Sequence, residues 1–98
     1  MTAKVFSVEY LDDVVLQATI APRLRQHRNI HTDYAESCQR LFNAIEPDSY
    51  IRPHRHGLVP RYETMIAVRG LMMLFVFDDH GRVADIAPFE VDSVIRCV

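Results

Sequence analysis

An uninterrupted apolar run, Leu71 to Phe77, is the feature that most constrains the fold of this chain. It is followed at once by Asp78-Asp79-His80-Gly81, whose residue types suit a tight turn, and then by a strand-like segment from Arg82 to Ile86. Two such segments joined by a short turn with glycine predict an antiparallel β-hairpin. Because the first segment is apolar at every position, we expect it to be buried on both faces.

Further strand-like segments surround this hairpin and predict an antiparallel β domain over residues 38–98. Pro47-Asp48-Ser49 is a turn signal between two of them, and Gly70 marks a turn or bulge before the apolar run. Pro53 indicates an edge position or a bulge in its strand. The expected strands are Gln39–Ala44, Tyr50–His56, Tyr62–Arg69 and Glu90–Val98.

Residues 1–37 predict a helical N-terminal arm, and we expect residues 1–98 to form a single, mainly β domain. Ser7 suits a helix N-cap, and Pro22 should end the helix. A short strand-like piece, Ala3–Phe6, precedes the cap. A short helix or turn over residues 21–26 and a loop further on are expected to follow Pro22. The helix has apolar residues at helical spacing at Leu11, Val14, Val15 and Ala18.

Composition narrows the classes of function. The net charge of −2 gives no electrostatic reason to expect nucleic acid or a membrane surface as partner. No segment has the apolar length of a bilayer span and the N-terminus lacks the apolar core of a secretory signal, so we expect a cytoplasmic protein. Cys38 and Cys97 are then expected to be reduced and partly buried. A basic cluster is more typical of a solvated face than of a site for an anionic ligand; it comprises Arg23, Arg25, His27 and Arg28.

The segment His54-Arg55-His56, with Glu63 seven residues after His56, predicts a metal site. On a strand, residues two apart point to the same side, so His54 and His56 would present two imidazoles together. An adjacent strand carrying Glu63 opposite the histidine pair would add a carboxylate. Two histidines and one carboxylate are a known ligand set for zinc and for non-haem iron. The alternative is a set of solvated polar side chains on an exposed strand.

Four other residues are candidates for binding a substrate. Arg52 shares the predicted face of His54 and would either bind an anionic group or pair with a nearby acid. Gln39 and Asn43 share a strand face and would either line a pocket or form hydrogen bonds inside the fold. Tyr50 would be either a general acid or, as the residue type favours, a buried structural tyrosine. The residues alone assign no catalytic group.

The spacing His54-x-His56-(x)6-Glu63-(x)6-Gly70 resembles the first conserved motif of the cupin superfamily. Further segments are more specifically similar to the WbuC family of cupin-fold metalloproteins. They are Arg28–His31, Gln39–Ala44, Ser49–His56 and Phe77–Val83. The resemblance spans roughly residues 8–83 and implies a small or partial antiparallel jelly-roll barrel. It also implies one divalent metal ion (Zn, Fe, Mn or Ni) on His54, His56 and Glu63, and a link to bacterial surface-polysaccharide biosynthesis.

The resemblance is incomplete at the second cupin motif. That motif usually supplies a fourth ligand, a histidine, and residues Pro88–Val98 contain no histidine. We therefore expect a water-open site with three protein ligands; His31 is a weak candidate for a fourth ligand, and His80 is expected to be exposed in its turn. Apolar strands without further strands to cover them predict a homodimer, with strand exchange as one route.

Two classes of function follow from the resemblance. One is a metal-dependent protein acting on a small molecule such as a sugar or nucleotide-sugar. The other is a cupin that binds metal or ligand without catalysis, or has only a structural role, because it lacks the fourth ligand. Neither class calls for a nucleic-acid or membrane partner.

Overall fold

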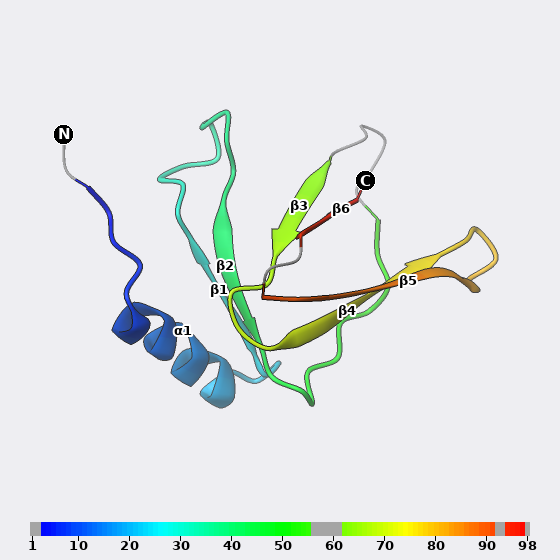
Figure 1. The fold of residues 1–98 in the computed structure, drawn as a ribbon, viewed down its shortest axis with the longest axis horizontal. Coiled ribbons are helices and arrows are strands. Elements are labelled where there is room, and N and C mark those ends of the chain that lie inside the picture. Colours follow the sequence, from blue (N-terminus) through cyan, green and yellow to red (C-terminus); the bar gives the residue numbers. More distant parts are fainter. Residues whose placement is uncertain (1–2, 56–61, 92–93, 98) are drawn as a thin grey trace. The chain divides into compact units, whose positions relative to one another are not determined.

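The computed structural model describes residues 3–55, 62–91 and 94–97 as one helix and six strands (Figure 1). Two compact units divide the chain, Met1–Ile51 and Arg52–Val98. The strands form three two-stranded sheets, all antiparallel, and the described residues contain no closed barrel. The prediction of a mainly β, antiparallel protein with an N-terminal helix is confirmed. No helix among these residues is long and apolar enough to cross a membrane.

The N-terminal unit consists of α1 (Val8–Ile20) packed on the hairpin of β1 (Arg25–Asn29) and β2 (Leu41–Ile45). As predicted, the helix begins after Ser7, whose Oγ accepts a hydrogen bond from the Tyr10 N–H at 3.2 Å. It ends at Ile20, two residues before Pro22, which has no N–H to continue the helix. Of the four apolar residues at helical spacing, Val14 and Ala18 are buried, Leu11 is half-buried and Val15 is exposed.

Strand β1 was not predicted, because its sequence Arg-Gln-His-Arg-Asn shows no apolar alternation. Its pairing with β2 runs in register from Arg25 opposite Ile45 to Asn29 opposite Leu41. The structure thus places a strand inside the segment 1–37 that was predicted as a helical arm. Pairing with a distant strand decided this, and local sequence preference did not.

An aromatic cluster joins the helix to this hairpin. The Phe6 ring lies 5.2 Å from Tyr10 and 4.9 Å from Phe42, and the Tyr10 and Phe42 rings are 5.6 Å apart, all edge-on. The expected strand over Ala3–Phe6 is wrong: this segment has no regular structure, and Phe6 contributes its ring to the cluster instead.

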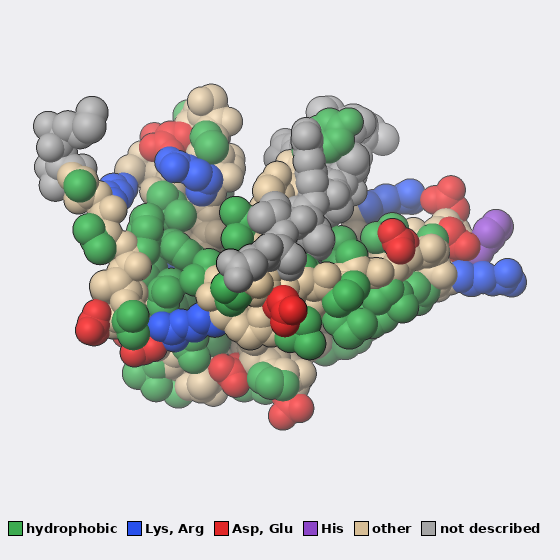
Figure 2. All heavy atoms as spheres, viewed as in Figure 1, with side chains coloured by type: hydrophobic (Ala, Val, Ile, Leu, Met, Phe, Trp, Pro, Cys, Tyr) green, Lys and Arg blue, Asp and Glu red, His purple; other side chains and the backbone are tan. Residues whose placement is uncertain are grey.

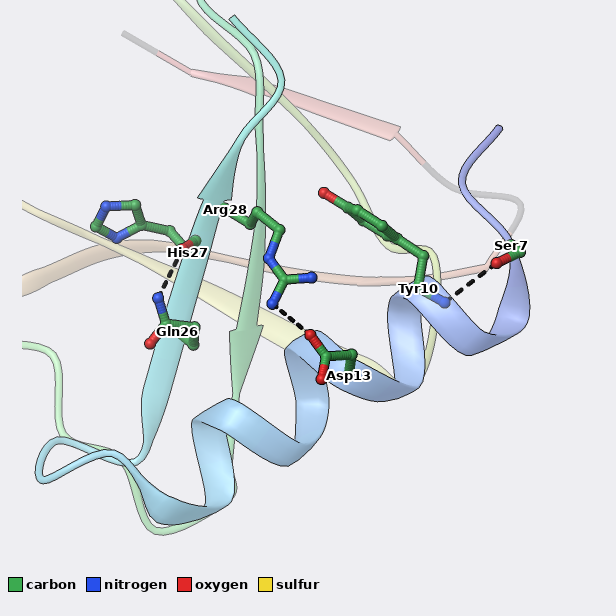
Figure 3. Close-up of polar contacts among 6 residues, drawn as sticks. All are labelled: Ser7, Tyr10, Asp13, Gln26, His27 and Arg28. Atoms are coloured by element: carbon green, nitrogen blue, oxygen red, sulfur yellow. Dashed lines mark hydrogen bonds and ion pairs between the residues drawn. The ribbon is translucent and has the colours of Figure 1, made fainter. Parts of the chain in front are cut away.

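Arg28 adds a polar contact on the same side of β1. Its Nη2 donates to Asp13 Oδ2 at 2.7 Å, and its guanidinium lies 5.1 Å from the centre of the Tyr10 ring (Figure 3). The hydrogen bond to Asp13 raises the pKa of Arg28 above its already high ordinary value. The side chain thereby links β1 to the middle of α1.

The C-terminal unit contains β3 (Glu63–Ile66), β4 (Leu71–Phe77), β5 (Val83–Glu90) and β6 (Val94–Cys97). β4 and β5 form the predicted hairpin around Asp78–Gly81, and the Gly81 backbone has the positive φ, +76°, that this turn requires. Gly70, with φ +73°, makes the turn that leads from β3 into β4. β3 pairs with β6.

The expectation that Leu71–Phe77 is buried on both faces is wrong. Only Met72 and Leu74 of β4 are half-buried, and the other side chains are exposed. Figure 2 shows apolar side chains along this hairpin and charged ones at its tip. One face of the hairpin is partly covered, with Met72 and Leu74 half-buried and Phe89, opposite Met72, buried, and the other face is accessible. The exposed apolar residues of the hairpin include Leu71, Met73, Phe75, Val76, Phe77, Val83 and Ile86.

Candidate metal site and its surroundings

The segment carrying the predicted metal ligands has no regular secondary structure. Residues 50–55 are not part of any strand, so the prediction of a strand over Tyr50–His56 is wrong for its described part. Pro53, at its middle, has no N–H to offer a neighbouring strand. His56 lies outside the described residues. Strand alternation therefore cannot be the reason for His54 and His56 to share a side, and the metal triad stays a prediction.

The His54 ring contacts a backbone carbonyl, which bears on which ring nitrogen carries the hydrogen. Its Nδ1 lies 3.1 Å from the carbonyl oxygen of Arg52. Because a carbonyl oxygen can only accept, Nδ1 carries the hydrogen and donates it. The neutral ring then has its lone pair on Nε2, the atom that would bind a metal. Metal-binding histidines commonly donate their other N–H in this way, to a carbonyl or a carboxylate.

Glu63 is the first residue of β3, and its side chain is exposed. Its partner in the sheet is Cys97 of β6, and a histidine pair opposite Glu63 in a hairpin stays a prediction. Among the residues that the structure describes, which exclude His56, no group of three or more His, Cys, Asp or Glu side chains is placed to hold a metal ion.

Arg55 connects the motif segment to the tip of the β4–β5 hairpin. Its Nη1 lies 3.6 Å from Asp79 Oδ1, and both side chains are almost fully exposed. Such a pair contributes little to stability, about 0–1 kcal/mol. The contact does place the motif segment beside the turn that contains His80, which is exposed as predicted.

Gln39 and Asn43, both candidates for substrate binding, belong to the N-terminal unit and have different surroundings. The Gln39 side chain donates to two backbone carbonyls of its own loop, Asp33 at 3.2 Å and Glu36 at 2.8 Å. This supports the structural role that its sequence context left open. Asn43 is exposed on β2, and the register places it opposite His27 of β1. Residues opposite each other in an antiparallel pair share a face, so Asn43 and His27 are neighbours.

Tyr50 and Arg52 are also exposed. Tyr50 retains 76% of its accessible surface, so the interpretation as a buried structural tyrosine is wrong. Its carbonyl oxygen accepts a hydrogen bond from Arg25 Nη1 at 3.0 Å. The carbonyl of Arg52 accepts from His54, as described above. Cys38, expected to be partly buried, is a free and exposed thiol.

His31, the candidate for a fourth ligand, is buried, which the sequence did not predict. Only 7% of its surface is accessible, and its Nδ1 lies 2.8 Å from the carbonyl oxygen and 3.2 Å from the amide nitrogen of Arg40. Its ring also lies 5.5 Å from that of Tyr34. Nε2 is buried without a hydrogen-bond partner among the described residues. The contacts to Arg40 give His31 a structural role where the chain leaves β1 and returns to β2.

A basic turn forms a second polar feature, for which the sequence favoured a solvated face. Arg23, Arg25, Gln26 and His27 line a surface concavity of about 260 Å³ at the junction of α1 and β1. Arg28, the remaining member of the basic cluster, lies on the other side of β1 from His27 (Figure 3). The alternation of side chains along β1 therefore divides the cluster into a helix-facing residue and a group around the concavity.

Comparison with known proteins identified one family. A family model described as a domain of unknown function (DUF6016) matches residues 6–88. The match begins just before α1, ends within β5, and includes His54, Glu63 and Gly70. No curated protein and no solved structure matches the chain significantly.

Proposed function

The chain belongs to the DUF6016 family, and we propose that it is a metal-binding protein of cupin type that acts on a small molecule such as a sugar or nucleotide-sugar. The ligands are His54, His56 and Glu63, holding one divalent ion. The antiparallel strands and single N-terminal helix agree with a small or partial cupin barrel. The cupin-like spacing of the motif adds the ligand set, and the WbuC resemblance adds the link to bacterial surface-polysaccharide biosynthesis.

The contact between His54 Nδ1 and the Arg52 carbonyl is the observation that carries the proposal. An exposed histidine gains little from such a bond in stability, since water would serve the same nitrogen. Its consequence is chemical: in this contact Nδ1 is the donor, which leaves Nε2 as the basic nitrogen of the neutral ring. A divalent ion at Nε2 would polarise a carbonyl or bind a pair of hydroxyls of the small molecule.

Metal analysis of protein purified without chelator tests the site. We expect close to one metal ion per chain, and loss of that ion in His54→Ala and in Glu63→Ala, because each variant removes one ligand of three. His27→Ala, which removes an exposed histidine of the N-terminal unit, is the matched control and should retain the metal. Unchanged metal content in both ligand variants would refute the assignment.

Turnover separates the two functional classes. Loaded protein that converts a nucleotide-sugar, with activity lost alongside metal in His54→Ala, would be an enzyme. Loaded protein that binds the same compounds without converting them would be the non-catalytic alternative, a binding or structural cupin.

We also propose that the protein forms a homodimer, with strand exchange as one route. The support is the exposure of large apolar side chains on both strands of the β4–β5 hairpin, such as Leu71, Phe75 and Ile86. Light scattering over a concentration series should give the mass of two chains at high concentration. A mass of one chain throughout the series would exclude the dimer.

A further inference from the structure

The junction of α1 and β1 contains a surface concavity that the metal proposal does not use. The concavity there, about 260 Å³, is lined by Arg23, Arg25, Gln26 and His27, so three of its four lining residues are basic types and none is acidic. We propose that it binds a small phosphorylated molecule through the phosphate group. Clefts for drug-sized ligands measure about 300–1,000 Å³, so this concavity suits a smaller one.

Among the described residues, no carboxylate forms an ion pair with the guanidinium group of Arg23 or Arg25. Arginine ion pairs in the described residues include Arg28 with Asp13 and Arg55 with Asp79. Within that part of the chain, neither Arg23 nor Arg25 pairs with an acid. Arg25 uses Nη1 for the Tyr50 carbonyl, which orients its side chain and leaves its positive charge in place. Two cations at one concavity favour a multiply charged anion, and the guanidinium fork matches phosphate oxygens.

The backbone that carries the arginines is fixed by the segment that follows β2. The carbonyl of Arg23 accepts from Ser49 Oγ at 2.7 Å, and the carbonyl of Leu24 accepts from the Glu46 N–H at 2.9 Å. Leu24 has a positive φ of 56°, a sparsely populated conformation for a residue with a side chain, at the point between the two arginines. The turn is therefore held in its conformation before any ligand arrives, which lowers the ordering cost of binding.

The face of β1 next to the concavity offers groups for the rest of the ligand. His27 lies on the side of β1 away from Arg28 and is exposed (Figure 3). Asn43 stands opposite His27 in the register, so its amide is next to the site. Gln26 Nε2 donates to the His27 carbonyl, which orients the Gln26 amide. Amides in such positions suit the hydroxyl groups of a sugar phosphate.

Titration of the full chain with inorganic phosphate and with glucose 6-phosphate tests the site. Calorimetry should detect glucose 6-phosphate binding that weakens as salt is added, as expected for contacts between exposed charges. Arg23→Gln should weaken it about tenfold or more, because a charged hydrogen-bond donor is lost. Inorganic phosphate binding as tightly as the sugar phosphate would identify the phosphate group as the whole of the recognised chemistry, and would support the proposal.

Matched variants distinguish binding at this site from effects of the overall charge and of the proposed metal. Arg82→Gln removes the same charge from the exposed tip of the β4–β5 hairpin and should leave binding unchanged. His54→Ala should also leave it unchanged, and Arg23→Lys, which retains the charge without the fork, should fall between wild type and Arg23→Gln. The proposal is overturned by absence of binding to the wild type, by equal losses in Arg23→Gln and Arg82→Gln, or by loss in His54→Ala alone. Far-UV circular dichroism of Arg23→Gln checks that the variant is folded.

Discussion

The two units of this chain bury their apolar residues to different extents. In Met1–Ile51, the helix α1 lies on the β1–β2 hairpin, with Val14 and Ala18 at most 2% exposed and three aromatic rings in contact. In Arg52–Val98, the described strands form two two-stranded sheets, and the buried apolar side chains are Ala67 and Phe89. The N-terminal unit thus has a helix over one face of its sheet, and the described part of the C-terminal unit contains no helix.

The difference shows how a helix packed on a small sheet contributes to its stability. A two-stranded sheet by itself is marginally stable in water, since it leaves both faces accessible. A helix with an apolar stripe removes one face from solvent, at roughly 25 cal/mol for each Å² of apolar surface buried. β1 is short and polar, yet it belongs to the hairpin that the helix covers, while the apolar β4 strand is mostly exposed. The proposed metal and dimer both lie in the unit whose described residues form the smaller core.

Metal removal should give the largest effect and should act on one unit only. If the site is filled at about 1,000 times its dissociation constant, chelation costs the C-terminal unit about 4 kcal/mol. We expect hydrogen exchange to accelerate at the amides of β3 and β6, with α1 unchanged. His54→Ala should give the same pattern without chelator. Equal acceleration of hydrogen exchange in both units would show that the metal does not stabilise the C-terminal unit alone.

A pair of identical substitutions compares the cores directly. Phe42→Ala removes the ring that contacts Phe6 and Tyr10 and should cost about 2–4 kcal/mol in urea unfolding. Phe75→Ala, at a β4 side chain that is 47% exposed, should cost less than about 1 kcal/mol under conditions where the chain is monomeric. Similar losses would show that the two rings are equally buried in solution.

The smallest effect concerns acid stability of the loop between β1 and β2. Glu36 Oε1 accepts a hydrogen bond from Thr32 Oγ1 at 2.6 Å, and this bond, with one from the Thr32 backbone, holds the pKa of Glu36 below its ordinary value of 4.5. A lowered folded-state pKa gives stability that is present above pH 4.5 and is lost as the pH falls through the folded-state value.

Thr32→Val removes the side-chain bond, so its melting temperature should fall slightly below that of wild type at neutral pH. The two curves should converge toward about pH 3, where the carboxyl group is protonated in both states. Thr32→Ser keeps the hydroxyl and serves as the control. A constant difference across the pH range would show that the loss is one of packing.

Local features of the sequence predicted the features of the fold that depend on a few neighbouring residues. The apolar spacing of the helix included its two buried residues, Val14 and Ala18. Ser7 and Pro22 predicted the two ends of the helix, and Gly81 predicted the hairpin turn. Each of these depends on a cap, a missing N–H or a positive φ, which act within one turn of chain. The predicted site is only partly visible in the structure, which adds the His54 tautomer through a contact two residues away.

What the sequence by itself determined is a mainly antiparallel β chain with one capped helix and a histidine-rich motif spaced like that of a cupin. The tertiary structure alone decided the pairing of β1 with β2 and of β3 with β6, and the exposure of β4. The physical reason is distance along the chain: backbone pairing and burial depend on which remote segments meet. The sequence around a residue does not determine which remote segment it will pair with.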